Sequence, residues 1–393
     1  MAIRQLTPPS SNGKTAINSH NPQNFDLEVF FNRVNQQMRN RFKGFAVILS
    51  DPNGDRLGFT RDGWAIDPAD SGPSEPFTLD TPSAIGSLTK LFTNVVVLKR
   101  STGAGQYRTL EERLQSRFSH FLPRRWWDDV HADYRNVTVT ELLQHKAGFK
   151  KSGGGVHISE RLSKPRELDT APGTRTYSNT SMGIFHFIFA KWGLYYPWEL
   201  HETEIKHRNS NTDTYNEEIQ KATSRSFNVD GLYEMILKPL EIQASADPSN
   251  GTWPTGMPEY FPYGTPARTY SSPTDSSGQL LDDVTLNAAS GGLYISAKGL
   301  AKFISSVKSG SFLTSQQRDL MMNDGPADDL LGFWAKSAEG GRCFTHNGSR
   351  SGSHADVLIF PNLFSAVFVA NSPDSSLDEQ GILISAYGAA HSN

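Results

Sequence analysis

Ser87 and Lys90 lie three residues apart in the segment AIGSLTKLFTNVVVLKR, which spans residues 84–100. Residues at this spacing share one face of a helix, with Cβ atoms roughly 5–6 Å apart, so the amine can reach the serine oxygen. A lysine removed from water holds its proton less tightly and can act as a base. The positive end of a helix that starts near Ser87 would also stabilise a developing alkoxide. The pair is therefore a candidate nucleophile with its activating amine.

The same spacing occurs twice more, in SNGK at residues 11–14 and in SSVK at residues 305–308. Ser11 lies in a segment rich in Pro, Ser and Asn that we expect to be flexible. Ser305 lies near the end of a predicted helix, where the helix dipole has the wrong sign for an alkoxide. Ser87 stands at a helix start, so its context favours it over the other two serines.

A second candidate element is YSN at residues 177–179. A tyrosine beside a lysine ammonium loses its proton more readily, so Tyr177 could serve as a general base. The Asn179 amide could donate to a substrate carbonyl and orient the lysine. YRN at residues 134–136 has the same pattern, but no glycine turn precedes it, and we predict a structural role for Tyr134.

A third element is HNGS at residues 346–349, on a predicted strand whose backbone can approach a ligand at Gly348. The backbone N–H of Ser349, together with that of Ser87, would form an oxyanion hole with two donors. Each such donor contributes roughly 3 kcal/mol in acyl transfer. His346 and Asn347 are candidate substrate-binding residues.

Aromatic residues cluster in a Pro- and Gly-rich stretch that we predict to be a long loop, at residues 251–278. Packing is the favoured role for any single one of them. As a group, the residues from Trp253 through Tyr260 to Tyr263 are predicted to form part of a cleft wall suited to a bulky apolar or aromatic substrate.

These candidates must be positioned by elements that the sequence also predicts. Residues 25–42 carry a helical pattern, and two strand-like runs flank a turn at Asn53-Gly54. The middle of the chain is helical, with a polar insertion near residues 200–227. A helix at 292–310, a strand meander and a last helix follow. Strands at both chain ends can pair in one sheet while the middle forms a helical lobe.

Composition limits the function classes. The chain has 393 residues, 37% of them hydrophobic, and a net charge of −3, which predicts a globular protein without the basic surface of nucleic-acid binders. We expect no membrane span and no signal peptide, and hence a cytoplasmic protein. No metal-ligand spacing or phosphate-binding loop is present, so no cofactor is predicted. The single cysteine, Cys343, is predicted to be buried.

The order S-x-x-K, Y-x-N, H-x-G resembles the serine β-lactamase and penicillin-binding-protein superfamily, closest to the esterases related to class C β-lactamases. AIGSLTKLFT resembles its nucleophile helix, and TVTELLQHKAGF resembles its LLxHxSG segment. APGTRTYSNTSMGI, AASGGLYISAKGLAKF and HNGSRSGSHADVLIFP resemble later family segments in the family's order. Together these segments cover about residues 25–390.

The resemblance implies an α+β fold, three-layer α/β/α with an antiparallel sheet, plus a helical lobe. The domain organisation that we predict is a flexible arm at 1–24 and a single domain at 25–393. Within that domain, the α/β lobe comprises residues 25–86 and 285–393, and the helical lobe comprises residues 87–284.

The resemblance also implies an acyl-enzyme mechanism, in which Ser87 attacks a carbonyl and Lys90 and Tyr177 share the proton transfers. Departures from the family pattern narrow the range of expected substrates. His346 replaces the usual lysine, and a neutral histidine attracts a carboxylate weakly, which favours an esterase or peptidase. Lys146 replaces a small hydroxyl residue, and the pattern gives no account of it. Arg350 could bind a carboxylate, although a solvated loop arginine is favoured.

The favoured hypothesis is a serine hydrolase that forms an acyl-enzyme with an ester or amide of a small molecule, most simply an esterase. An acyltransferase that uses the same site is the first alternative. A non-catalytic scaffold is the second, and the intact set of Ser87, Lys90, Tyr177 and Asn179 argues against it.

Overall fold

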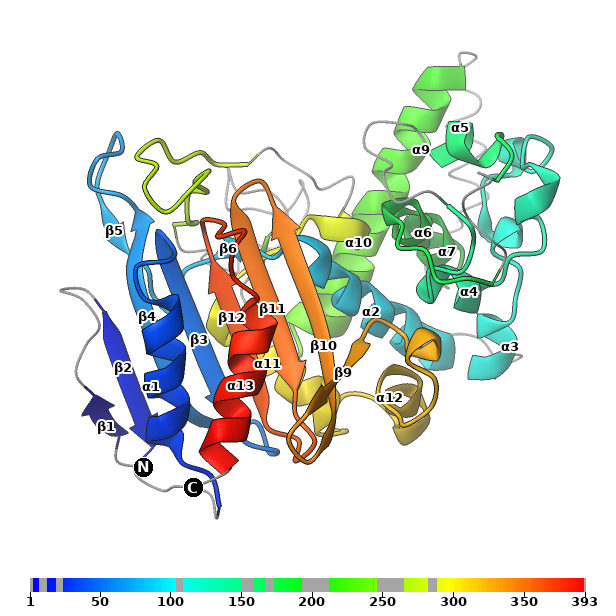
Figure 1. The fold of residues 1–393 in the computed structure, drawn as a ribbon. Coiled ribbons are helices and arrows are strands. Elements are labelled where there is room, and N and C mark those ends of the chain that lie inside the picture. The colour runs from blue at the N-terminus through cyan, green and yellow to red at the C-terminus, as the bar shows by residue number, and fades with distance from the viewer. Residues whose placement is uncertain are drawn as a thin grey trace.

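A computed structural model of the chain describes residues 3–6, 13–18, 24–103, 109–149, 158–166, 173–192, 212–242, 244–245, 265–281 and 288–391. Trp253 and Tyr260, predicted to line the cleft, lie outside the described residues. Figure 1 shows a twisted sheet with helices on both faces and a helical lobe at one side.

An antiparallel sheet of nine described strands joins the two ends of the chain. Its order is β1 (Ile3–Leu6), β2 (Lys14–Asn18), β4 (Arg56–Ile66), β3 (Gly44–Ser50), β12 (Ser365–Ala370), β11 (Ser353–Ile359), β10 (Gly341–Arg350) and β9 (Trp334–Ala338), with β5 (Glu75–Pro76) paired to β4. The predicted hairpin is present, because β3 and β4 pair around a turn in which Gly54 has a φ of +92°. The predicted meander is present as β10, β11 and β12.

Helices cover both faces of this sheet. Helices α1 (Leu27–Met38) and α13 (Glu379–His391) lie side by side on one face (Figure 1), and α2 (Thr89–Gly103) and α11 (Ala297–Lys308) lie on the other. Side chains of β3 alternate between the two cores: Phe45 and Val47 pack toward α1 and α13, and Ala46 and Ile48 pack toward α2 and α11. The predicted three-layer α/β/α arrangement is confirmed.

The helical lobe packs around α2. Its described elements are η1 (Gly86–Leu88), α3 (Leu110–Leu114), η2 (Phe118–Phe121), η3 (Arg124–Trp126), η4 (Ala132–Tyr134), α4 (Val139–Leu143), α5 (Ile158–Leu162), α6 (Asn179–Gly183), α7 (Phe185–Trp192), α9 (Thr212–Ser226) and the π-helix η5 (Phe227–Leu237). The short α10 (Ala288–Gly291) closes the lobe against α2 and α6, and α12 (Ser315–Met321) and η7 (Ala327–Asp329) precede β9. Within the described residues, no helix is both long enough and apolar enough to cross a membrane.

The structure corrects three expectations. Residues 3–6 and 14–18 of the supposed flexible arm are strands, and Ala16 and Ile17 are buried because β2 pairs with β4. The described part of the polar insertion is α9, which buries Tyr215 and Ile219 against the lobe. The helix predicted from residue 292 begins only at residue 297. Before it, β8 (Tyr294–Ile295) pairs with β6 (Ser83–Ala84) and β7 (Ala244–Ser245).

Candidate active site

The candidate nucleophile lies in a 3-10 turn that leads directly into α2. Ser87 is half-buried in this turn, η1. The residue before it, Gly86, has a φ of +48°, a left-handed conformation that glycine adopts without a steric penalty. A Cβ atom at Gly86 would stand 2.6 Å from the carbonyl oxygen of Ser349. Glycine therefore lets the nucleophile turn rest directly against the backbone of β10.

Lys90 is buried, with 1% of its surface exposed, and reaches the nucleophile from the first turn of α2. Its Nζ atom donates to Ser87 Oγ at 3.1 Å, to Asn179 Oδ1 at 2.8 Å and to the carbonyl oxygen of Ser290. These acceptors match the three N–H donors of an ammonium group. Burial lowers the pKa of Lys90 to about 7. The amine is thus poised to lose and regain a proton near neutral pH.

The Tyr177 hydroxyl contacts Ser87 Oγ, but its protonation differs from the expectation. Lys90 Nζ lies 4.8 Å from the centre of the tyrosine ring and donates elsewhere. Burial raises the pKa of Tyr177, and its hydrogen bond with Ser87 only partly opposes this. The phenol therefore keeps its proton, and the prediction that the lysine charge makes it a ready base is wrong.

His145, the histidine of the segment that resembles LLxHxSG, supports the tyrosine. It is buried, and its ring lies 4.9 Å from the Tyr177 ring. Its Nδ1 atom accepts the backbone N–H of Ser178 at 3.2 Å. Burial lowers the pKa of His145 well below its usual value, and the charge of Lys90 acts in the same direction. A neutral imidazole therefore fixes the backbone next to Tyr177.

Strand β10 meets the nucleophile turn at Gly348. A Cβ atom there would collide with the carbonyl oxygen of Ile85 and would stand 2.9 Å from the backbone nitrogen of Ser87. Only glycine permits this approach without moving one of the two backbones. The backbone nitrogens of Ser87 and Ser349 therefore belong to adjoining stretches of chain, as a shared oxyanion hole requires.

Strand alternation separates two of the predicted binding residues. His346 is 3% exposed, and burial, together with the charge of Lys90, lowers its pKa to about 3, so its ring is neutral. Asn347 pairs across the strands with Asp356, whose carboxylate accepts a hydrogen bond from Gln380 of α13. Cross-strand partners share one face of a sheet. Asn347 therefore lies on the α13 face, away from Lys90, and its predicted role in substrate binding is wrong.

Comparisons with known proteins bear on the fold that holds this site. Residues 32–192 match the Beta-lactamase family model, and no curated protein matches the chain in sequence. A class C β-lactamase from Rhodobacter sphaeroides is similar in structure, with a TM-score of 0.63 and 16% identity over 93% of this chain and 99% of that one. The chain has the β-lactamase fold.

Two further structures share that fold. A β-lactamase/D-alanine carboxypeptidase from Pseudomonas syringae has a TM-score of 0.63 and 15% identity over 93% of this chain and 98% of that one. SurE with D-Leu has a TM-score of 0.59 and 17% identity over 91% of this chain and 72% of that one. The family model over residues 32–192 and the shared fold both agree with the resemblance inferred from the motifs.

Within this β-lactamase fold, Lys146 has a structural explanation. Its Nζ atom forms an ion pair with Asp329 Oδ1 at 2.6 Å, and Gln144 donates to the Asp329 carbonyl oxygen at 2.9 Å. Arg175, two residues before Tyr177, donates to the carbonyl oxygen of Ala327 at 2.9 Å. These contacts fasten η7 to the segments that carry the site. Arg350 is half-buried at the end of β10.

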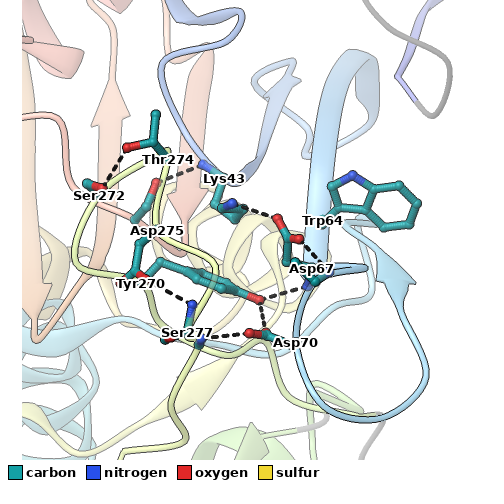
Figure 2. A network of polar contacts seen from close by, with 12 residues as sticks. Lys43, Trp64, Asp67, Asp70, Tyr270, Ser272, Thr274, Asp275 and Ser277 are labelled. Carbon is teal, nitrogen blue, oxygen red and sulfur yellow. Dashed lines mark hydrogen bonds and ion pairs between the residues drawn. The ribbon is translucent and has the colours of Figure 1, made fainter.

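A polar network surrounds Tyr270, as Figure 2 shows. The Tyr270 hydroxyl donates to Asp70 at 2.6 Å and accepts the backbone N–H of Asp67 at 2.8 Å. Lys43 donates to Asp67 at 2.6 Å. A Cβ atom at Gly352, in the turn between β10 and β11, would collide with the Tyr270 carbonyl oxygen. The network thus holds the segment at residues 265–281 against the end of β10.

Two other chemistries find no support in the described residues. No group of three or more His, Cys, Asp or Glu side chains in that part of the chain is placed to hold a metal ion. Cys343 is buried, and burial raises the pKa of its thiol to about 12. A thiolate nucleophile at that position is therefore disfavoured.

Proposed function

We propose that this protein is a serine hydrolase that forms an acyl-enzyme at Ser87 with a small-molecule ester or amide, and that esters are its preferred substrates. The observation that carries the proposal is the buried Lys90 amine, which contacts Ser87 Oγ and has a pKa near 7. A neutral amine in hydrogen-bond contact with a hydroxyl is the activated arrangement that nucleophilic catalysis requires.

The proposed acylation begins when Ser87 Oγ attacks the substrate carbonyl carbon. The hydroxyl proton passes to Lys90 Nζ, and the backbone N–H groups of Ser87 and Ser349 hold the oxyanion. When the bond to the leaving group breaks, Lys90 returns the proton to the departing alcohol or amine. Tyr177, which contacts Ser87 and stays protonated, relays that proton.

Deacylation repeats these steps with water. A water molecule attacks the acyl carbon, gives its proton to Lys90, and the bond to Ser87 Oγ breaks. Lys90 then restores the proton to Ser87. The reaction releases a carboxylic acid and regenerates the free hydroxyl, and it needs no cofactor.

His346 supports an ester preference. β-Lactams and peptidoglycan peptides carry a carboxylate, and a lysine at the His346 position would attract it. Burial keeps the His346 ring neutral, so the ring contributes no positive charge to a substrate carboxylate. Neutral esters carry no carboxylate, so their binding does not depend on a positive charge at residue 346.

The test combines a p-nitrophenyl ester with a fluorophosphonate probe, and the labelled residue is located by mass spectrometry. We expect label on Ser87 and catalytic release of nitrophenol. Ser87→Ala should abolish both, and the matched control Ser305→Ala, at the other helical S-x-x-K, should leave both unchanged. Absence of label on Ser87 in the folded protein would refute the proposal. Label without turnover in water, restored by added alcohols or amines, would indicate acyl transfer instead.

A further inference from the structure

A third buried histidine lies behind the candidate site and is not explained by the proposed chemistry. His186, on α7, is 1% exposed. Its Nδ1 atom lies 2.9 Å from Ser224 Oγ of α9, and its Nε2 atom lies 3.2 Å from the backbone nitrogen of Ala289 in α10. The ring also packs 5.1 Å from that of Phe227. One side chain therefore ties together three helices.

The partners of His186 fix its tautomer. A backbone N–H can only donate, so Nε2 must be the unprotonated acceptor for Ala289. The ring proton is then on Nδ1 and is donated to Ser224 Oγ. Burial lowers the pKa of His186 to about 3, so the ring stays neutral near neutral pH. The Nε2 atom of His186 is therefore free to accept from α10 at every pH near neutrality.

Ala289 is the residue in α10 that needs such an acceptor. It lies in the first turn, where backbone N–H groups have no partner within the helix, and it is fully buried. A buried N–H without an acceptor is destabilising. The Ala289 carbonyl oxygen is held as well, because Thr93 Oγ1 of α2 donates to it at 2.7 Å. The next residue, Ser290, presents its carbonyl oxygen to Lys90 Nζ.

We infer that His186 is a positioning residue that holds the Ser290 carbonyl oxygen against the Lys90 amine. The chain of contacts runs from Ser224 through His186 to Ala289, and from its neighbour Ser290 to Lys90. The inference rests on the proposed function, in which Lys90 is the base. Without the His186 acceptor, α10 shifts and Lys90 loses one of the three oxygen atoms that stabilise its charged form.

Two substitutions of His186 separate positioning from packing. The amide oxygen of glutamine can stand where Nε2 stands and accept from Ala289, whereas an asparagine amide reaches only the place of Nδ1. The readout is the rate at which the fluorophosphonate labels Ser87, measured across the range around neutral pH. His186→Asn should move the midpoint of the pH–rate curve, where Lys90 is half protonated, about one pH unit lower. The reason is that the charged Lys90 amine loses an acceptor. His186→Gln should keep the midpoint of the natural protein.

Ile219→Val is the control, since it loosens α9 in the same lobe without touching α10, and it should not move the midpoint. If the natural protein takes no label, the proposed function fails, whatever the variants do. If it is labelled and His186→Asn keeps its midpoint, the inference is overturned. Equal shifts in His186→Asn and in either His186→Gln or Ile219→Val would also overturn it, because they indicate packing alone. If His186→Asn does not fold, Ser224→Ala, which frees the ring from α9, must shift the midpoint downward by a smaller amount, and no shift overturns the inference.

Discussion

Two S-x-x-K pairs on helices can be compared in this molecule, Ser87–Lys90 and Ser305–Lys308. Both lysines are buried, with 1% and 2% of their surfaces exposed, and burial lowers the pKa of each, to about 7 and about 8. Only Lys90 donates to its serine. Lys308 donates to the carbonyl oxygens of Asp51 and Leu363 and to Ser365 Oγ, and so ties the end of α11 to the sheet.

The comparison shows that spacing, burial and a lowered pKa do not by themselves make a catalytic pair. What differs is the set of groups around the two residues. Ser87 begins a helix and lies against Gly348 of β10, whereas Ser305 lies in the last turn of its helix. Lys90 donates to Ser87, Asn179 and the Ser290 carbonyl oxygen, whereas the acceptors of Lys308 belong to the sheet and its connecting segments.

The largest effect should separate the two lysines. Lys90→Met should slow labelling of Ser87 by about 10³-fold or more, because the nucleophile loses its base. Lys308→Met should leave the labelling rate unchanged but should lower the melting temperature, because two backbone carbonyls lose a buried donor. Labelling kinetics and thermal denaturation of both variants measure this. Loss of labelling in Lys308→Met would remove the distinction between the pairs.

The tyrosines of the two Y-x-N sequences offer the next contrast. Tyr177→Phe should slow acylation by about 10²-fold, since proton transfer to the leaving group loses its relay. Tyr134 is 2% exposed and stacks on Phe149 with ring centres 4.5 Å apart. Tyr134→Phe should therefore keep the rate of the natural protein. An unchanged rate in Tyr177→Phe would exclude that residue from the mechanism.

The pH dependence of acylation should follow the ionisation of Lys90 and not that of Lys308. As pH rises through about 7, Lys90 loses its proton and becomes a base, so the labelling rate should rise roughly tenfold per pH unit below that value and level off above it. The curve should be the same in Lys308→Met. A midpoint that moves with Lys308→Met would mean that the two buried lysines are coupled.

The smallest effect is expected from the pair that fastens η7. The Lys146 side chain is 16% exposed and that of Asp329 is 52% exposed, so solvent screens their attraction. Lys146→Ala should cost about 1 kcal/mol or less of stability and should barely change the labelling rate. Urea denaturation and labelling kinetics check this. A large loss of activity would assign η7 a direct part in the site.

The sequence predicted the layers well, because they follow from local patterns of periodicity. The contact between Ser87 and Lys90 also agrees with their spacing, and their part in catalysis stays a prediction. Periodicity located the strands of the meander, and the context of Ser87 distinguished it from Ser305. Strand alternation could also have excluded Asn347: with His346 and Gly348 on the site face, their intervening neighbour must point away. The short β2 strand was missed because its burial depends on pairing with β4, far along the chain.

Other parts of the site had no signal in the sequence. The Ser290 carbonyl is a backbone atom, and any residue could provide it. His186 acts through contacts between helices that only the folded lobe brings together. The protonation of Tyr177 depends on how deeply it is buried, which side-chain spacing does not encode.

The pairing of β3 with β12 joins residues 44–50 to residues 365–370, so strands from the two ends of the chain meet within one sheet. During synthesis, Ser87 and Lys90 leave the ribosome long before the strand that carries Gly348 and Ser349. A nascent chain therefore carries Lys90 and Ser87 before it carries Ser349, whose backbone N–H belongs to the proposed oxyanion hole. The proposed site is complete only when the final strands add to the sheet, late in translation, so we expect a chain without those strands to be inactive.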